Sequence, residues 1–119
     1  MYVKLLKSKL HRARVTSTVL DYPGSMAVDA DLMKETGLKP YESVFIADIN
    51  NGNRLETYVI EAEAGSGKIE ILGAAARLID PGDIIIVFSF GFYGPDEIEG
   101  HKPSVIALDE NNRIIKRVS

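Results

Sequence analysis

The 119-residue sequence predicts a mainly β fold, a compact β-barrel with one or two short helices. Two observations support this. Short runs rich in β-branched and aromatic residues recur along the chain between clusters of Gly, Asn, Asp and Pro, and a helical pattern is confined to short stretches. The length suits a single domain, residues 1–119, with a modest core.

In the first half, alternation of apolar and polar residues predicts strand structure between Val3 and Val19. A short helix is expected next, with Asp29 or Asp31 capping its start and Gly37 just past its end. After it, residues 43–49 are predicted to be a strand that enters a tight turn at 50–53, because Asn-Gly accepts the positive φ of such a turn.

The second half is expected to be almost entirely strand. The predicted strands are 54–63, 68–72, 84–90, 104–108 and 113–118. The run from Ile84 to Phe90 is nearly continuously apolar, which predicts burial on both of its faces. A helical turn is expected near Pro95.

The composition excludes several functions. The net charge of −3 does not favour nucleic acid, and two histidines without any cysteine do not favour a metal site. The cationic N-terminal segment alternates as a strand does, so a basic nucleic-acid arm is not expected. The longest aliphatic and aromatic run, Ile84 to Phe88, is too short to span a bilayer, and no signal-peptide pattern precedes it. A cytoplasmic protein is expected.

The segment Tyr22-Pro23-Gly24-Ser25-Met26 has two interpretations. Local chemistry predicts a type II turn, with Gly24 supplying the positive φ. Alternatively, the Gly24–Ser25 bond breaks itself, because the Ser25 hydroxyl can attack the Gly24 carbonyl if the backbone is bent and no Cβ obstructs it. The ester so formed can β-eliminate, leaving a carboxyl group on Gly24 and a pyruvoyl group at position 25.

Several short motifs decide between these interpretations. They are Lys9-Leu10-His11-Arg12, Tyr22-Pro23-Gly24-Ser25, Asn51-Gly52-Asn53-Arg54-Leu55-Glu56-Thr57-Tyr58, Gly73-Ala74-Ala75-Ala76 and Pro81-Gly82-Asp83. Together, in this order and at this spacing, they resemble the pyruvoyl-dependent aspartate 1-decarboxylases. The resemblance implies a double-psi β-barrel assembled as a homotetramer, with its sites at the subunit boundaries.

The resemblance also implies the chemistry. Self-cleavage would give a small chain, 1–24, and a large chain, 25–119, with a covalent pyruvoyl group made from Ser25 and neither metal nor pyridoxal phosphate. L-aspartate would form a Schiff base on that group and lose CO2, leaving β-alanine for pantothenate biosynthesis. Tyr58 would be the proton donor. Some members of the family need a maturation partner, and the resemblance leaves that point open for this chain.

The remaining roles implied by the resemblance fall into three sets. Processing would involve Gly24, Ser25 and Thr57, with Tyr22 as a supporting contact. Substrate binding would use Lys9, His11, Arg54, Thr57, Gly73, Ala74 and Ala75. Strand alternation places Arg54, Glu56 and Tyr58 on one face and Thr57 on the other. A bulge that re-aims Thr57, or a site shared between subunits, would reconcile this with the family roles.

One position departs from the family pattern. Leu72 stands where the family usually has asparagine, so an amide near the expected scissile bond is missing. Two alternatives therefore remain beside aspartate decarboxylation. One is a pyruvoyl decarboxylase that acts on a different amino acid. The other is a non-enzymatic β-barrel binding or assembly module with an uncleaved chain.

Overall fold

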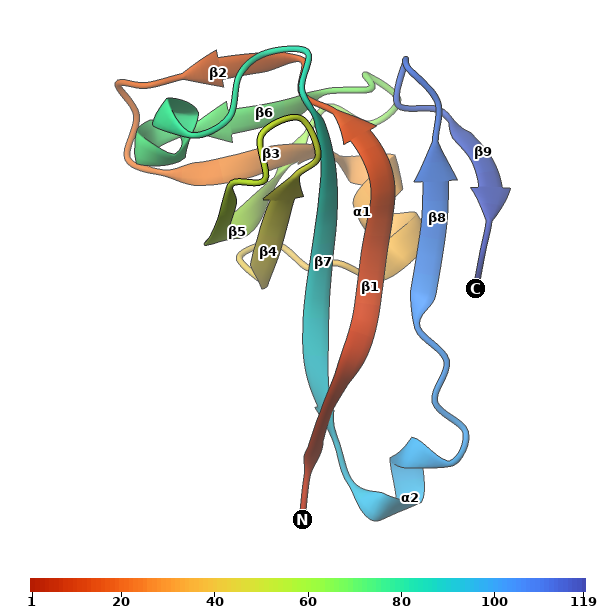
Figure 1. Ribbon diagram of the computed structural model, residues 1–119. Helices are drawn as coiled ribbons and strands as arrows, with labels where there is room; N and C mark the ends of the chain where they lie inside the picture. The colour runs from red at the N-terminus through yellow and green to blue at the C-terminus, as the bar shows by residue number, and fades with distance from the viewer.

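A computed structural model describes residues 1–119, which form nine strands, two short α-helices and one 3-10 helix (Figure 1). In chain order these are β1 (Val3–Arg14), β2 (Ser17–Val19), β3 (Ser25–Asp29), α1 (Ala30–Thr36), β4 (Ser43–Asp48), β5 (Arg54–Ala62), β6 (Ile69–Leu72), η1 (Gly73–Arg77), β7 (Ile84–Tyr93), α2 (Pro95–Ile98), β8 (Ser104–Leu108) and β9 (Ile114–Arg117). The prediction of a mainly β fold with one or two short helices is confirmed. Neither helix is long and apolar enough to cross a bilayer.

The strands are hydrogen-bonded in the order β2-β6-β3-β5-β4-β7-β1-β8-β9. Two strands that matter for the site lie inside this order. β1 pairs antiparallel with β7 and parallel with β8, and β3 pairs parallel with β5 and antiparallel with β6. Because the order ends at β2 and β9, closure into a double-psi barrel stays a prediction.

β1 and β7 continue side by side beyond the rest of the sheet, and α2 follows the far end of β7 (Figure 1). The opposite end of the molecule holds β2, β3 and β6 together with η1 (Figure 1). An asparagine in the β8–β9 turn links distant segments: the Asn112 Nδ2 atom donates to the carbonyl oxygens of Arg14 and Gly67, both at 2.8 Å. This buried side chain ties the end of β1 to the β5–β6 turn.

The core is one cluster of 18 buried hydrophobic residues contributed by most strands and by α1. α1 begins as predicted, and Asp29 rather than Asp31 is its cap, since the Asp29 side chain accepts from the Asp31 N–H at 2.8 Å. Leu32 and Met33 are buried, and Gly37 ends the helix in the left-handed conformation. Side chains on one face of a short helix therefore complete the core.

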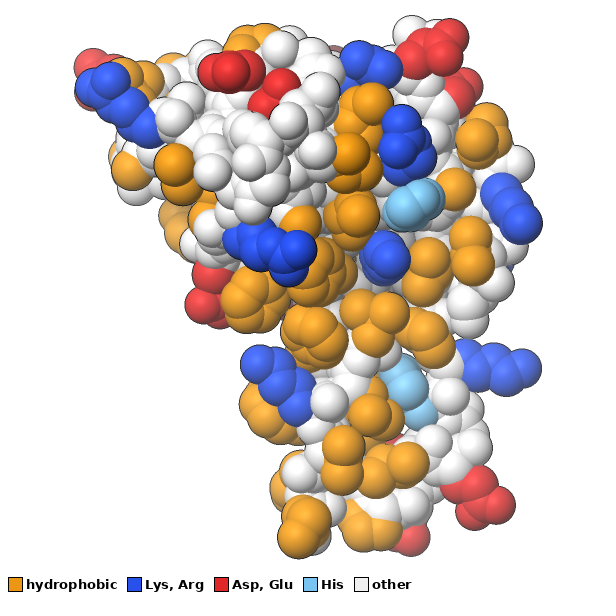
Figure 2. Space-filling view, in the orientation of Figure 1, with side chains coloured by type: hydrophobic (Ala, Val, Ile, Leu, Met, Phe, Trp, Pro, Cys, Tyr) orange, Lys and Arg blue, Asp and Glu red, His pale blue; other side chains and the backbone are white.

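The prediction that residues 84–90 are buried on both faces is wrong. Ile85 and Val87 are buried, but Phe88 is half-buried and Phe90 is exposed. β7 is antiparallel to both of its neighbours and carries no helical layer on its outer face. Its outward residues instead form part of an apolar surface, which Figure 2 shows as hydrophobic side chains gathered over β1 and β7.

Candidate active site at the Gly24–Ser25 turn

The Gly24–Ser25 segment is strained. Gly24 has a φ of 122° and Ser25 has a φ of 130°. Glycine adopts such angles readily, whereas a serine there is held in a conformation that L-residues avoid. Ser25 opens β3, and its backbone is held in register opposite Leu72 of β6, while the next residue, Met26, pairs with Val59 of β5. Strand pairing on both sides therefore holds the strained serine in place.

The Ser25 hydroxyl is buried and unpaired. The residue is 2% exposed, and its Oγ atom has no hydrogen-bond partner. Leu72, its partner across β3 and β6, is aliphatic and also buried, so this neighbour offers no donor or acceptor from its side chain. A buried hydroxyl without a partner is unfavourable, and such groups in native proteins often have a chemical role.

Gly73 and the alanines after it lie against the same turn. Gly73 is buried at the start of η1, with a φ of 87°, and approaches the backbone of Gly24 closely. Ala74 is exposed and Ala75 packs partly buried against the core. The structure therefore brings the Gly73 backbone to the predicted scissile bond.

Tyr58 reaches the turn from β5. Its hydroxyl donates a hydrogen bond to the Gly24 carbonyl oxygen at 3.3 Å, and 40% of the residue is exposed. Tyr41 is its aromatic neighbour, with the ring centroids 6.4 Å apart. The predicted proton donor thus lies beside the predicted scissile bond. Tyr22 lies on the other side, where its carbonyl oxygen faces Gly73.

Thr57 does not join this group. It is half-buried on the opposite face of β5 from Tyr58, and its hydroxyl makes no hydrogen bond. The pairing of β4 with β5 runs without a register shift from Ser43–Tyr58 to Ala47–Arg54. The bulge that would have re-aimed Thr57 is therefore absent, and strand alternation holds as predicted.

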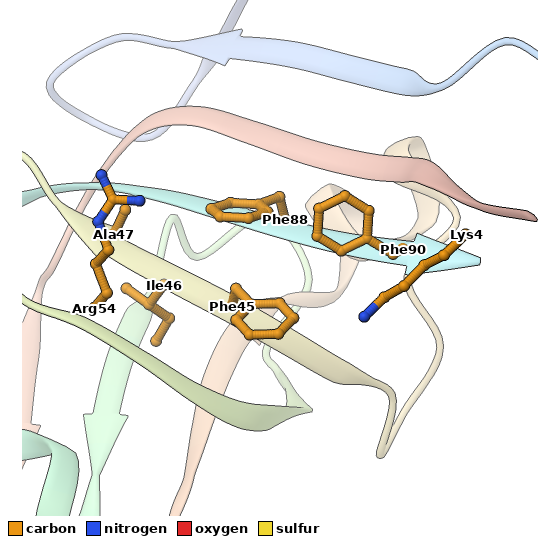
Figure 3. Close-up of a pocket in the computed structure, with 7 residues that line it drawn as sticks. All are labelled: Lys4, Phe45, Ile46, Ala47, Arg54, Phe88 and Phe90. Atoms are coloured by element: carbon orange, nitrogen blue, oxygen red, sulfur yellow. The ribbon is translucent and has the colours of Figure 1, made fainter. Parts of the chain in front are cut away.

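Lys9 and Arg54 form a second group, apart from Ser25. Both line a cavity of about 220 Å³ on the outward face of β1, β4 and β7. Arg54 also lines a neighbouring groove of about 350 Å³, in which Phe45, Phe88 and Phe90 lie between Arg54 and Lys4 (Figure 3). The two cavities contain neither Ser25 nor Tyr58. The cavities that the predicted cations line therefore do not include the predicted scissile bond.

His11 lies on β1 opposite Ala107 of β8 and is half-buried. Burial lowers the pKa of its imidazole, and the charges of Lys9 and Arg12 lower that pKa further. Its Nδ1 atom is buried without a partner. A neutral imidazole at pH 7 follows, and no hydrogen bond joins it to the Gly24–Ser25 turn.

The sequence analysis did not single out the aromatic part of the Arg54 groove. Phe45 and Phe88 are register partners on β4 and β7, and their rings stack at 5.9 Å. A signal existed in the chain, because Ile86, Phe88 and Phe90 recur at the period of a strand and must share one face. The expected burial of this strand on both faces gave no reason to place these aromatic residues on an exposed face.

Known proteins match almost the whole chain. The family model described as aspartate decarboxylase matches residues 1–115. An aspartate 1-decarboxylase of Acetivibrio thermocellus is 50% identical over 115 residues, which is 97% of this chain and 91% of the relative. Those of Thermosipho africanus and Desulfotalea psychrophila are 48% and 44% identical, over 94% and 96% of this chain and 92% and 96% of the relatives. The chain belongs to the aspartate decarboxylase family.

Proposed function

We propose that this chain cleaves itself between Gly24 and Ser25 and then decarboxylates L-aspartate to β-alanine and CO2. The observation that carries the proposal is the Ser25 hydroxyl, buried and unpaired next to a strained peptide bond. The relatives named aspartate 1-decarboxylase support the choice of substrate.

The proposed cleavage proceeds in three steps. The Ser25 Oγ adds to the Gly24 carbonyl carbon, the C–N bond breaks, and the nitrogen takes up the hydroxyl proton, which leaves an ester and a free amine. Loss of the Ser25 Cα proton then expels the Gly24 carboxylate from Cβ and leaves dehydroalanine. Water replaces the nitrogen of its imine tautomer, releasing ammonia and leaving a ketone on residue 25. One water is consumed and no oxidant is required.

The surroundings of Ser25 fit a pyruvoyl group. The Oγ atom has no partner to lose when it departs, and the Gly73 backbone lies directly against Gly24 on the other side of the bond. When formed, the pyruvoyl group supplies an electron sink for the carbanion left by decarboxylation. β3, held between β5 and β6, would carry it.

Tyr58 is proposed to give its hydroxyl proton to the α-carbon of the substrate after CO2 leaves. Its hydroxyl already contacts the Gly24 carbonyl oxygen, which places the proton one residue from the reacting position. Arg54 and Lys9 are proposed to hold the carboxylate that persists in the product. A cation on the departing carboxylate would favour the ground state, because that charge disperses as CO2 forms.

We propose that these two groups meet between subunits of a homotetramer. The support is the separation of Ser25 and Tyr58 from the cavity that Lys9 and Arg54 share within one chain. An apolar groove beside Arg54 suits a surface that a second copy covers. The roles of Thr57, His11, Tyr22, Ala74 and Ala75, a maturation partner and the cytoplasmic location stay predictions.

Intact-protein mass spectrometry of the freshly purified chain tests the proposal, with a hydrazine that traps carbonyl groups in a parallel sample. Two fragments are expected, 1–24 and a hydrazine-reactive 25–119, and native conditions should keep four copies of each together. The purified protein should convert L-aspartate to β-alanine.

Ser25→Ala is the matched control. This variant is expected to remain one unreactive chain and to make no β-alanine, because it lacks the attacking oxygen. A single unreactive wild-type chain would favour the uncleaved binding module instead. Cleavage together with turnover of another amino acid, and none of aspartate, would leave the processing chemistry standing but replace the substrate.

A further inference from the structure

Gly73 makes the closest backbone approach among the glycines. A Cβ built on it would lie 2.7 Å from the Gly24 Cα, 2.8 Å from the Tyr22 carbonyl oxygen and 2.9 Å from the Gly24 nitrogen. All three neighbours are backbone atoms, so they cannot yield as the end of a flexible side chain does. Even the smallest side chain at this position would therefore push the turn away.

The strand register explains the contact. Ser25 pairs with Leu72 across the antiparallel strands β3 and β6. The next residues outward are Gly24 and Gly73, so two glycines face each other where the ladder ends. Both have positive φ, at 122° and 87°. The absence of a Cβ on Gly73 lets the Tyr22–Gly24 segment bend over it.

We propose that Gly73 is a positioning residue for self-cleavage, because its bare backbone seats the Tyr22–Gly24 segment in the bend that brings the Gly24 carbonyl to the Ser25 hydroxyl. This role rests on the proposed function. It differs from the substrate contact that the family resemblance implies for Gly73, since it acts before any substrate binds. The scissile bond is then shaped from across the sheet, by a residue distant in sequence.

Gly82 offers a matched control. Its φ is also 87°, but a Cβ there would meet nothing within 4 Å. Gly82→Ala therefore imposes the same backbone penalty as Gly73→Ala without the collision. A difference between the two variants isolates the contact with the turn from the general cost of a left-handed alanine.

The experiment follows cleavage in time. Wild type, Gly73→Ala and Gly82→Ala are made by cell-free synthesis, and the intact and cut fractions are measured by mass spectrometry. Gly73→Ala is expected to cleave at least tenfold more slowly than wild type, and Gly82→Ala at the wild-type rate within twofold. Both substitutions are also made in the uncleavable Ser25→Ala background, where their thermal midpoints report folding without cleavage.

Slow cleavage of Gly73→Ala, with a midpoint near that of Gly82→Ala in the Ser25→Ala background, supports the role. Equal cleavage rates for the two glycine variants overturn it, while cleavage of the wild type keeps the proposed function intact. A Gly73→Ala chain that does not fold in that background also overturns it, because the contact then serves the fold. A wild-type chain that never cleaves overturns the proposed function, and this role with it.

Discussion

Two turns of this chain have similar sequence signals and opposite physical states. Residues 50–53 connect β4 to β5 through Asn-Gly, and residues 22–25 lead into β3 through Pro-Gly. In the first, positive φ is confined to Gly52, and Asn50, Asn51 and Asn53 all make side-chain hydrogen bonds. In the second, a serine shares the positive φ and its hydroxyl has no partner.

The two turns also differ in what holds them in place. In the 50–53 turn, the side-chain amides of Asn51 and Asn53 donate to the Leu78 carbonyl oxygen. The Asn50 side chain accepts a hydrogen bond from the Ile84 N–H. These bonds hold the turn between β4 and β5 against the segment that leads into β7. The 22–25 turn receives one side-chain hydrogen bond, from the exposed Tyr58 hydroxyl to the Gly24 carbonyl oxygen at 3.3 Å, and is otherwise held by strand pairing and by close packing on Gly73. Backbone strain beside a buried hydroxyl without a partner fits the proposed cleavage of the Gly24–Ser25 bond.

Among the changes that leave the Ser25 hydroxyl in place, Tyr58→Phe is expected to have the largest effect on turnover. Loss of the proton donor should lower kcat for aspartate roughly 10³-fold, within the range of general acid catalysis. The hydrogen bond to the Gly24 carbonyl oxygen is exposed and neutral, so its loss should slow cleavage by about fivefold at most. Mass spectrometry and a β-alanine assay measure the two effects separately. Wild-type turnover by this variant would remove Tyr58 as the acid.

Close to the 50–53 turn, one side-chain atom lacks a hydrogen-bond partner. It belongs to Asp48, the last residue of β4. Asp48 is 2% exposed, and its Oδ2 atom is buried without a partner. Burial, together with the neighbouring Asp83 carboxyl group, raises the pKa of this carboxyl group to about 6, although the Asn50 and Asn51 backbone N–H groups act to lower it. Asp48 in the folded chain therefore keeps its proton to a higher pH than a free carboxyl group does.

This proton makes stability depend on pH with a defined sign. Between about pH 4 and pH 6 the unfolded chain releases it while the folded chain keeps it, so the free energy of unfolding falls as pH rises and levels off above pH 6. The loss is on the order of 3 kcal/mol at 1.36 kcal/mol per pKa unit. Asp48→Asn should remove most of it, as measured by urea unfolding at pH 4.5 and 7.5 in the Ser25→Ala background. An unchanged slope would mean that Asp48 is not the group that holds this proton.

The smallest effect is expected from Asn53→Ala in the 50–53 turn. This change removes the hydrogen bond of 2.8 Å from the Asn53 Nδ2 atom to the Leu78 carbonyl oxygen. The free energy of unfolding should fall by about 1 kcal/mol, since the bond is neutral and partly solvated. Cleavage between Gly24 and Ser25 should keep its wild-type rate. A slower cleavage would show that the two turns are coupled and do not act independently.

Much of this fold could be predicted from local patterns. The helix after Ser25, its Asp and Gly ends, the 50–53 turn and the alternation of Arg54 to Tyr58 depend on residues near one another in sequence, and all of them are present. The burial of β7 could not be predicted this way. An apolar strand has the same sequence pattern whether its outer face is covered by the same chain or by another subunit. The effect of Asp83 on the pKa of Asp48 joins the end of β4 to the residue before β7, and it gives no local signal.

The candidate site was also predictable only in part. The motif around Ser25 and the family resemblance identified the residues, but not their distances. That Tyr58 rather than Thr57 contacts the Gly24 carbonyl oxygen depends on how β3, β5 and β6 pair. The approach of Gly73 to Gly24 depends on the register of β6 against β3. Strand register is set by the whole sheet, so neither contact is visible in a single stretch of sequence.

The place of β1 between β7 and β8 has a consequence for the lifetime of the protein. Cleavage would leave this central strand, with Lys9 and His11, on a separate peptide held only by its two ladders and its packing. A single folding chain would become a two-component complex, whose reassembly after unfolding depends on concentration. The ketone end could not be rejoined to Gly24. The time for which the mature protein stays folded would then be set by its unfolding rate, and not by a reversible equilibrium between the folded and unfolded states.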